Sequence, residues 1–204
     1  MALIKLNNRG VKNATAFGSI SSLGSLTFIS KQTASSSATI SFTSGIDSTY
    51  KEYIFYFKNL HNSDDDNQFS FNFSTDGGSN YNITKTSTHF YAIHTEADST
   101  AFSYYAGGDL ANGTGDQILS AELGGGNDES LSGEMYLFDP SSDTFVKPFI
   151  AKVNEYRASA GISTNYVSGY GNTQSAINAV QFSMIRSGET IQSGKIKLYG
   201  IKDS

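Results

Sequence analysis

Apolar and polar residues alternate along much of this chain, and this period of two constrains its fold more than any other feature. Phe69, Phe71 and Phe73 alternate with Ser70 and Asn72, so all three rings lie on one side of an extended segment. Side chains of a β-strand point alternately to its two faces, and the pattern therefore predicts a strand with one buried face. No segment carries a sustained stripe of helical period, so we expect no long helix.

Twelve short runs of strand-like residues follow one another along the chain, separated by clusters of Gly, Asn, Asp and Ser. Many short strands joined by such turns are typical of sandwiches and barrels. We predict an all-β fold, a single antiparallel β-sandwich that is jelly-roll-like. The predicted strands cover residues 26–30, 38–42, 53–57, 69–73, 88–93, 101–105, 117–122, 133–138, 145–153, 165–170, 179–185 and 194–201.

Two of these runs carry further information. Residues 53–57 are apolar on both faces, which is typical of a strand covered on both sides, and we place it centrally in its sheet. Pro148 cannot donate a hydrogen bond to a neighbouring strand, so we expect 145–153 to be an edge strand or to carry a bulge. The alternation also predicts these core residues: Phe42, Phe55, Phe71, Phe73, Leu137, Phe182, Ile196 and Leu198.

Length and composition exclude several classes of chemistry. The chain has 204 residues, which suits one β-sandwich domain. A domain of this size buries about 70% of the surface of its unfolded chain, so we expect it to fold without a disulfide, a metal or a cofactor. The absence of Cys excludes thiol nucleophiles and thiolate metal sites. The formal charge of −5 gives no basic surface for a phosphate backbone, so we expect no nucleic-acid partner.

The sequence also indicates how the chain relates to membranes. No apolar run approaches the ~20 residues that a membrane-spanning helix needs, so we expect no membrane insertion. The opening residues lack the continuous apolar region of a signal peptide. We therefore expect a protein that does not leave the cell by ordinary secretion.

Residues 1–24 differ from the rest of the chain because they contain few aromatic residues and much Ser, Gly and Asn. We predict that they form an extended N-terminal arm, which precedes a sandwich domain of residues 25–204. The alternative is that they contribute a first strand to the sandwich. The apolar residues with which the arm would pair with a strand edge or contact another subunit are Leu3, Ile4, Leu6 and Val11.

Residues 74–81 have a sequence that resembles the Asp box, a turn of the pattern Ser-x-Asp-x-Gly-x-x-aromatic found in many β proteins. Such a turn needs a carboxylate that accepts backbone N–H groups and glycines that adopt a positive φ. We predict a structural turn in a hairpin, with the aromatic ring packed beneath it. Its residues are Ser74, Asp76, Gly77, Gly78 and Tyr81.

The acidic run Asp64-Asp65-Asp66 contains the oxygen ligands that calcium prefers. Its spacing does not match an EF-hand, so we interpret it as a solvated hairpin loop, predict no metal site, and leave calcium binding open. His89 and His94 are five residues apart on a predicted strand, so we expect them on opposite faces.

No catalytic residue is indicated. A glycosidase needs two carboxylates about 5 to 10 Å apart in a cleft, and nothing in the sequence brings two of the candidates together. The carboxylates considered are Glu122, Glu129, Glu134 and Glu155.

Tyrosines are the remaining candidates for ligand contact, because the ring can stack on a sugar ring and the hydroxyl can form hydrogen bonds with the sugar's hydroxyl groups. Core packing accounts for many of the rings, since Tyr is intermediate in burial. The tyrosines that we expect to face a ligand are Tyr91, Tyr104, Tyr105 and Tyr170.

Several segments together resemble one protein family. They are YKEYIF at 50–55, FNFSTDGGSNY at 71–81, LSGEMYLFDP at 131–140 and GKIKLYG at 194–200, and the opening MALIKLNNRGVK at 1–12 extends the resemblance to the whole chain. The family consists of virion-associated proteins of tailed bacteriophages that infect aquatic and marine bacteria. It has no established catalytic residues to transfer to this sequence.

The resemblance implies a non-enzymatic structural component of a bacteriophage particle, either an exterior head-decoration subunit or a tail-fibre subunit that docks by its N-terminal arm. It implies a homo-oligomer, with a trimer favoured, that contacts other virion proteins and is assembled in the host cytoplasm. A module of the tail that binds a host surface glycan is the alternative, and a glycan-degrading enzyme ranks third.

Overall fold

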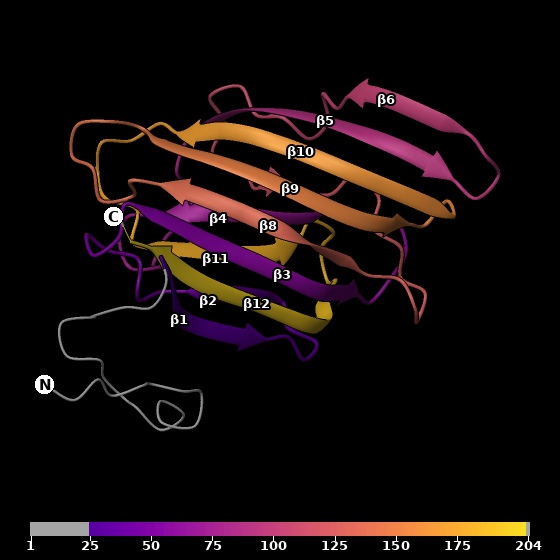
Figure 1. Ribbon diagram of the computed structural model, residues 1–204, viewed down its shortest axis with the longest axis horizontal. Helices are drawn as coiled ribbons and strands as arrows, with labels where there is room; N and C mark the ends of the chain where they lie inside the picture. The colour runs from indigo at the N-terminus through magenta and orange to yellow at the C-terminus, as the bar shows by residue number, and fades with distance from the viewer. Residues whose placement is uncertain (1–24, 203–204) are drawn as a thin grey trace, which may run out of the picture.

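The computed structural model describes residues 25–202, and these form twelve β-strands and no helix (Figure 1). The predicted all-β class is therefore confirmed, and each predicted run contains a strand, although 117–122 contributes only two residues. The strands are β1 (Leu26–Thr33), β2 (Thr39–Phe42), β3 (Glu52–Asn62), β4 (Phe69–Ser74), β5 (Lys85–Thr95), β6 (Thr100–Tyr104), β7 (Gln117–Ile118), β8 (Leu131–Phe138), β9 (Lys147–Arg157), β10 (Gly161–Gly171), β11 (Ala179–Met184) and β12 (Ile191–Ile201).

Two antiparallel sheets contain all the strands of the described range. The large sheet has the order β1-β12-β3-β8-β9-β10-β5-β6, and the small sheet has the order β2-β11-β4-β7. Figure 1 shows the strands of the large sheet side by side, from β6 at the upper edge to β1 at the lower edge. The predicted central position of 53–57 is confirmed, because β3 lies between β12 and β8.

Eight of the strands in residues 25–202 have jelly-roll connectivity. When β5, β6, β9 and β10 are set aside, the sheets read β1-β12-β3-β8 and β2-β11-β4-β7, and each strand lies in the sheet opposite to its predecessor except β7, which follows β4 in the small sheet. This is the arrangement of a jelly roll, in which two sheets are linked by Greek-key connections. The β5–β6 and β9–β10 hairpins are insertions that widen the large sheet.

Phenylalanine side chains fill the space between the two sheets of the jelly roll. The ring of Phe182 on β11 lies 5.3 Å from the rings of Phe55 and Phe57 on β3, and 5.7 Å from the ring of Phe69 on β4. Edge-on and offset contacts at this spacing stabilise the fold beyond the area that they bury. The predicted core is confirmed, because its eight residues have exposures of at most 2%.

The prediction for Pro148 is wrong. β9 lies inside the large sheet, between β8 and β10, and its pairing with them shows no register shift. Pro148 is opposite Tyr170 of β10, whereas the pairing with β8 begins only at Phe149. The strand tolerates the proline because the pairing of β9 with β8 stops at Phe149, so its missing N–H costs no bond on that side.

The loops at 63–68 and 75–84 are not hairpin loops, contrary to expectation. The first joins β3 of the large sheet to β4 of the small sheet, and the second joins β4 to β5 of the large sheet. Most consecutive strands of a jelly roll cross between the sheets, and a turn sequence between two alternating runs does not distinguish such a crossing from a hairpin.

Candidate functional site

The outward face of the large sheet carries a broad set of aromatic and aliphatic side chains, which we call the outer aromatic face. Side chains alternate along each strand, so the residues between core positions point away from the sandwich. Pairing between strands places these residues in rows that cross the sheet. The outer aromatic face comprises Phe28, Ile54, Tyr56, Phe90, Phe102, Tyr104, Tyr136, Phe138, Ile150, Ile162, Tyr166, Tyr170 and Tyr199.

One row crosses five neighbouring strands, from β1 to β9. It consists of Phe28, Tyr199, Ile54, Tyr136 and Ile150, each opposite the next. The rings of Phe28 and Tyr199 lie 5.5 Å apart in an edge-on contact. Ile54 is buried at 3% exposure although no third layer of described residues covers it, because the tyrosines on both neighbouring strands flank it. The row is therefore a continuous apolar surface.

A second row crosses the inserted strands. Tyr166 on β10, Phe90 on β5 and Tyr104 on β6 lie opposite one another, and the rings of Tyr166 and Phe90 are stacked at 5.2 Å. Phe102 extends this group, with its ring 5.6 Å from that of Phe90. At the other end, the Nζ of Lys152 lies 5.7 Å from the centre of the Tyr166 ring, within the range of a cation–π contact.

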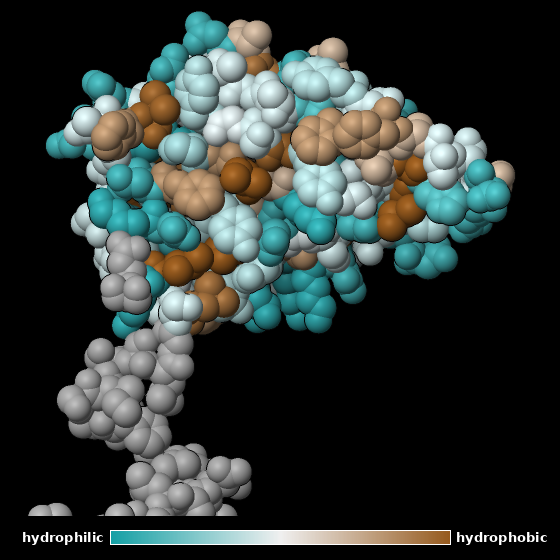
Figure 2. Space-filling view, turned by 45° about the horizontal axis from the view of Figure 1, so that its top comes forward, coloured by the Kyte–Doolittle hydropathy of each residue, from teal (hydrophilic) through white to brown (hydrophobic). Residues whose placement is uncertain are grey.

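Much of this surface is exposed to solvent. Phe102 is 72% exposed, Phe28 is 55% exposed and Ile150 is 51% exposed. Figure 2, in which the β6 edge is turned toward the viewer, shows apolar side chains in tan and brown as patches among hydrophilic ones. Single exposed apolar residues are ordinary, but neighbouring ones that form a patch mark interaction surfaces.

The outer aromatic face is hollowed at Gly169 of β10. A hollow of about 440 Å³ lies there, bordered by Pro148, Ile150 and Tyr170. A side chain at Gly169 would collide with the carbonyl oxygen of Thr86, so only glycine fits where β10 lies this close to β5. The hollow has the size and the mainly apolar lining of a site for a small ligand or for an inserted side chain.

Of the four tyrosines that were predicted to face a ligand, two lie on the outer aromatic face and two lie on the inner side of the sheet. Tyr104 and Tyr170 belong to the outer aromatic face, and the Tyr104 hydroxyl donates to Asp109 at 2.5 Å, which raises the pKa of Tyr104. Tyr91 and Tyr105 lie on the inner side, where their rings are 5.7 Å apart. These two tyrosines therefore contribute to the interior instead of to the outer aromatic face.

Most of the outer aromatic face is not among the predicted site residues. The sequence carries a partial signal for it, because alternation along a strand separates its two faces and places large apolar residues on one of them. The predicted strands contain Phe28, Phe90, Phe102 and Ile150, whereas Ile162 lies outside the predicted strand 165–170.

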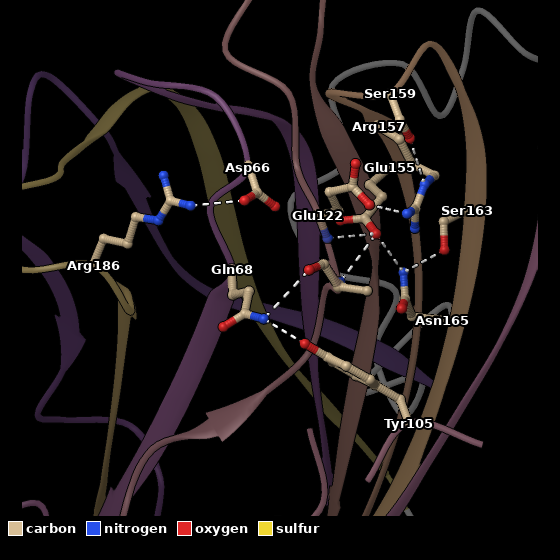
Figure 3. A network of polar contacts seen from close by, with 11 residues as sticks. Asp66, Gln68, Tyr105, Glu122, Glu155, Arg157, Ser159, Ser163, Asn165 and Arg186 are labelled. Carbon is tan, nitrogen blue, oxygen red and sulfur yellow. Dashed lines mark hydrogen bonds and ion pairs between the residues drawn. The ribbon is translucent and has the colours of Figure 1, made fainter. Parts of the chain in front are cut away.

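A second region lies in the interior beneath β9, β10 and β5, where polar side chains replace phenylalanine (Figure 3). Glu155 is fully buried, and its Oε1 accepts the backbone N–H of Ala121 at 3.0 Å and the amide of Asn165 at 3.1 Å. The Oδ1 of Asn165 lies 3.0 Å from Nε2 of buried His89. Burial disfavours the charged carboxylate and raises the pKa of Glu155 to about 7.

Ion pairs border this polar cluster. Arg157 on β9 pairs with Glu122, and both side chains are mostly buried. Arg186 pairs with Asp66 at 2.7 Å at the surface. Because Glu155 exposes none of its surface, the cluster is an internal network rather than a site that a ligand reaches directly.

The carboxylates considered for a glycosidase are not paired across a hollow described above. Glu155 is fully buried and Glu122 is bonded to Arg157. Glu129 accepts the N–H of the nearby Gly126 at 2.7 Å, and Glu134 lies on the outward side of β8.

The acidic loop is held by protein groups. Asp65 accepts the N–H of Gly125 at 2.7 Å, and Asp66 is paired with Arg186. Within residues 25–202, no group of three or more His, Asp or Glu side chains is arranged to hold a metal ion. His89 points inward and is buried whereas His94 is exposed, so the two lie on opposite faces as predicted.

Residues 74–81 form a compact turn through their side chains. Ser74 donates to the carboxylate of Asp76 at 2.6 Å, and the same carboxylate accepts the backbone N–H of Asn80 at 2.9 Å. The bonds from Ser74 and Asn80 lower the pKa of Asp76 to about 2. Both glycines of the turn have a positive φ, of 73° and 92°, and the Tyr81 ring packs against the second.

The predicted arm residues Leu3, Ile4, Leu6 and Val11 lie outside the described residues. Between residues 25 and 202 there is no helix that could cross a membrane. The outer aromatic face is the candidate functional site on the strength of its geometry. Comparisons of the chain with protein-family models, with curated proteins and with solved structures find no match.

Proposed function

We propose that this chain is a non-enzymatic structural component of a bacteriophage particle, an exterior head-decoration or tail-fibre subunit, and that its outer aromatic face packs against another subunit. The observation that carries the proposal is the exposure of Phe28, Phe102 and Ile150, each by half or more, within or beside the two rows. Aromatic residues are enriched in interfaces between proteins, where water is excluded from them.

The fold is compatible with this role. Jelly rolls build viral capsid domains and lectins, although this is an analogy at the level of the fold. β1 and β6 are the two edges of the large sheet, and each offers backbone groups to which another chain can add a strand. In our proposal, residues 1–24 are the arm that docks on a neighbouring subunit. The assembly is a homo-oligomer, with a trimer favoured, that forms in the host cytoplasm.

Sedimentation of the full-length chain tests the role of the outer aromatic face. We expect an oligomer for the wild type and a monomer for the double variant Ile150→Glu and Phe102→Glu, because two charges would be buried without partners. Ile185→Glu is the matched control, since Ile185 is also exposed but lies beyond the end of β11 in the small sheet. A wild-type monomer, or a double variant that still assembles, contradicts the proposal.

Deletion of residues 1–24 tests the arm. We expect the melting temperature to change little, while the truncated chain is no longer found by mass spectrometry in purified phage particles. A truncated chain that is incorporated normally, or one that unfolds, would show that these residues are not a docking arm.

Glycan recognition is the second candidate, and the hollow at Gly169 beside Tyr170 favours it. The stacked rings of Tyr166 and Phe90 would supply a platform for a sugar ring. Titration with purified host surface polysaccharide distinguishes the two candidates. Binding that is lost in Tyr166→Ala and Tyr170→Ala, in a chain that remains folded, would support a receptor-binding module.

A further inference from the structure

Lys85, Asn72 and Asp116 form a connected set of reactive groups at the start of β5. The Nζ of Lys85 lies 2.6 Å from Oδ1 of Asn72, and Nδ2 of Asn72 donates to Asp116 at 2.9 Å. Lys85 is fully buried and Asn72 is 3% exposed. The Lys85 amine is thus held beside Oδ1 of Asn72, the oxygen bonded to the carboxamide carbon Cγ. Both groups are buried away from bulk water.

The backbone brings these three residues together. β4 pairs with β7 so that Phe71 is opposite Gln117, and the next position in this register places Asn72 beside Asp116. Lys85 is attached to the same loop, because its N–H and C=O bond to Gly113 at 2.7 and 2.9 Å. The contact between the side chains is therefore fixed by the pairing of the main chain.

We propose that Lys85 and Asn72 form a spontaneous intramolecular isopeptide bond, which cross-links β5 of the large sheet to β4 of the small sheet. The lone pair of the neutral Nζ attacks Cγ of Asn72 and a C–N bond forms. The bond between Cγ and Nδ2 then breaks, one proton passes from Nζ to the leaving nitrogen, and ammonia departs. The products are a secondary amide and one ammonia, so the reaction needs no oxidant or other co-reactant.

The neighbours of the Asn72 amide fix its orientation and suit this reaction. Its Oδ1 also accepts the backbone N–H of Phe73 at 2.9 Å, and its Nδ2 also donates to the carbonyl oxygen of Thr114 at 3.1 Å. A backbone N–H can only donate and a carbonyl can only accept, so the oxygen and nitrogen positions are determined. The Phe73 N–H stabilises the negative charge that develops on Oδ1 during attack.

The reaction requires an uncharged Lys85 amine and a proton delivered to the leaving nitrogen of Asn72. Burial of Lys85 favours the first, and Asp116 is placed for the second. Asp116 contacts the nitrogen that must leave, and is the group placed to relay a proton to it. Burial lowers the pKa of Lys85 to about 8, against the opposing effect of the charge on Asp116. About a tenth of the amine is then neutral at pH 7, whereas an ordinary lysine amine is almost entirely charged.

Lys147 is an internal control. It is also fully buried, and it lies in the same row of the large sheet as Lys85, on the other side of Gly171. Both hydrogen bonds that the structure gives its Nζ end on backbone carbonyls, those of Phe145 at 2.7 Å and Thr173 at 3.1 Å. A backbone amide has no ammonia to release, so burial of a lysine alone does not give the reaction.

Mass spectrometry of the denatured full-length chain tests the proposal. We expect a mass that is one ammonia below that of the sequence, after allowance for processing of the N-terminus, and a branched peptide that joins Lys85 to Asn72. Lys85→Arg and Asn72→Ala should each restore the full mass, whereas Lys147→Met should keep the deficit. Asp116→Ala should slow formation of the bond by about 100-fold or more.

A wild-type mass without the deficit, in folded protein kept at pH 7 and at pH 9, would overturn the proposal. So would a deficit that maps to a succinimide at Asn112, which precedes Gly113, instead of to the branched peptide. The peptide map of the wild type decides between these outcomes even if a variant at Lys85 fails to fold.

Discussion

The jelly-roll strands and the inserted strands of the large sheet bury different kinds of side chain. Beneath the jelly-roll strands the interior is phenylalanine, packed around Phe182. The charged side chains that are buried within residues 25–202 all lie on the inserted strands β5 and β9. They are Lys85, Lys147, Glu155 and Arg157.

The difference follows from what covers each part of the sheet. The jelly-roll strands face the small sheet, whose backbone groups are paired within that sheet, so only side chains meet at the interface and these can be apolar. β5 and β10 are met by residues 105–124, which are mainly loop and have backbone groups that need other partners. Ser87 accepts the N–H of Leu110 at 2.9 Å, and Glu155 accepts that of Ala121.

β9 shows the change within a single strand. At one end, the ring of Phe149 lies 5.1 Å from that of Phe71 in the small sheet. Six residues further along, on the same inward side, Glu155 bonds to the loop instead. A sheet that extends past its partner sheet therefore requires polar side chains under the loops that replace it, and the perturbed pKa values of Glu155 and Lys85 are a consequence of their burial there.

The largest effect is expected in the phenylalanine region. Phe182→Ala removes the ring at its centre, and we expect the free energy of unfolding to fall by about 3 to 5 kcal/mol, from lost transfer energy and the cavity left behind. Urea denaturation at pH 7 measures this change. A loss below about 1 kcal/mol would mean that the rings around Phe182 do not pack as the structure shows.

The polar region should respond to pH instead. The pKa of Glu155 is raised from 4.5 to about 7 in the folded state, so the folded chain binds this proton more tightly than the unfolded chain. Its contribution to stability is complete below about pH 4.5 and is lost as pH rises to about 7, a change of up to about 3 kcal/mol. Glu155→Gln keeps an oxygen for Ala121 and Asn165 but does not titrate.

The difference in the free energy of unfolding between wild type and Glu155→Gln measures this effect. Because other carboxylates titrate equally in both proteins, the subtraction isolates Glu155. We expect the wild type to be relatively more stable at pH 5 than at pH 8. An equal difference at the two pH values would show that Glu155 titrates normally and is accessible to water.

Local pattern was sufficient to predict the strands and the core of this fold. Phe71 and Phe73 could be assigned to the interior because alternation is a property of neighbouring residues in one strand. The sheet to which a strand belongs depends on residues far away in the chain. For that reason the crossings at 63–68 and 75–84 were mistaken for hairpins, and Pro148 for a sign of an edge strand.

The candidate site was less accessible to sequence analysis for the same reason. Outward positions such as Phe90 and Ile150 follow from alternation, but their arrangement in rows depends on the register between strands. The inward position of Glu155 was predictable, because alternation through Phe149, Ala151 and Val153 places it on the same side of the strand. What alternation could not show is the loop that covers it and the partners that this loop supplies.

The smallest effect on the fold is expected at Phe102, the same residue type as Phe182 but 72% exposed on the inserted strand β6. In dilute solution, where the chain is monomeric, Phe102→Ala should change the free energy of unfolding by about 0.5 kcal/mol or less, because the folded monomer buries little of this ring. If the outer aromatic face is covered in the oligomer, the same substitution should lower the melting temperature at high protein concentration, since association stabilises the folded chain by mass action. Thermal unfolding of wild type and variant over a wide range of concentrations separates the two contributions. A loss above about 2 kcal/mol in dilute solution would show that Phe102 belongs to the core of the monomer, and an effect that is small at every concentration would remove Phe102 from the interface.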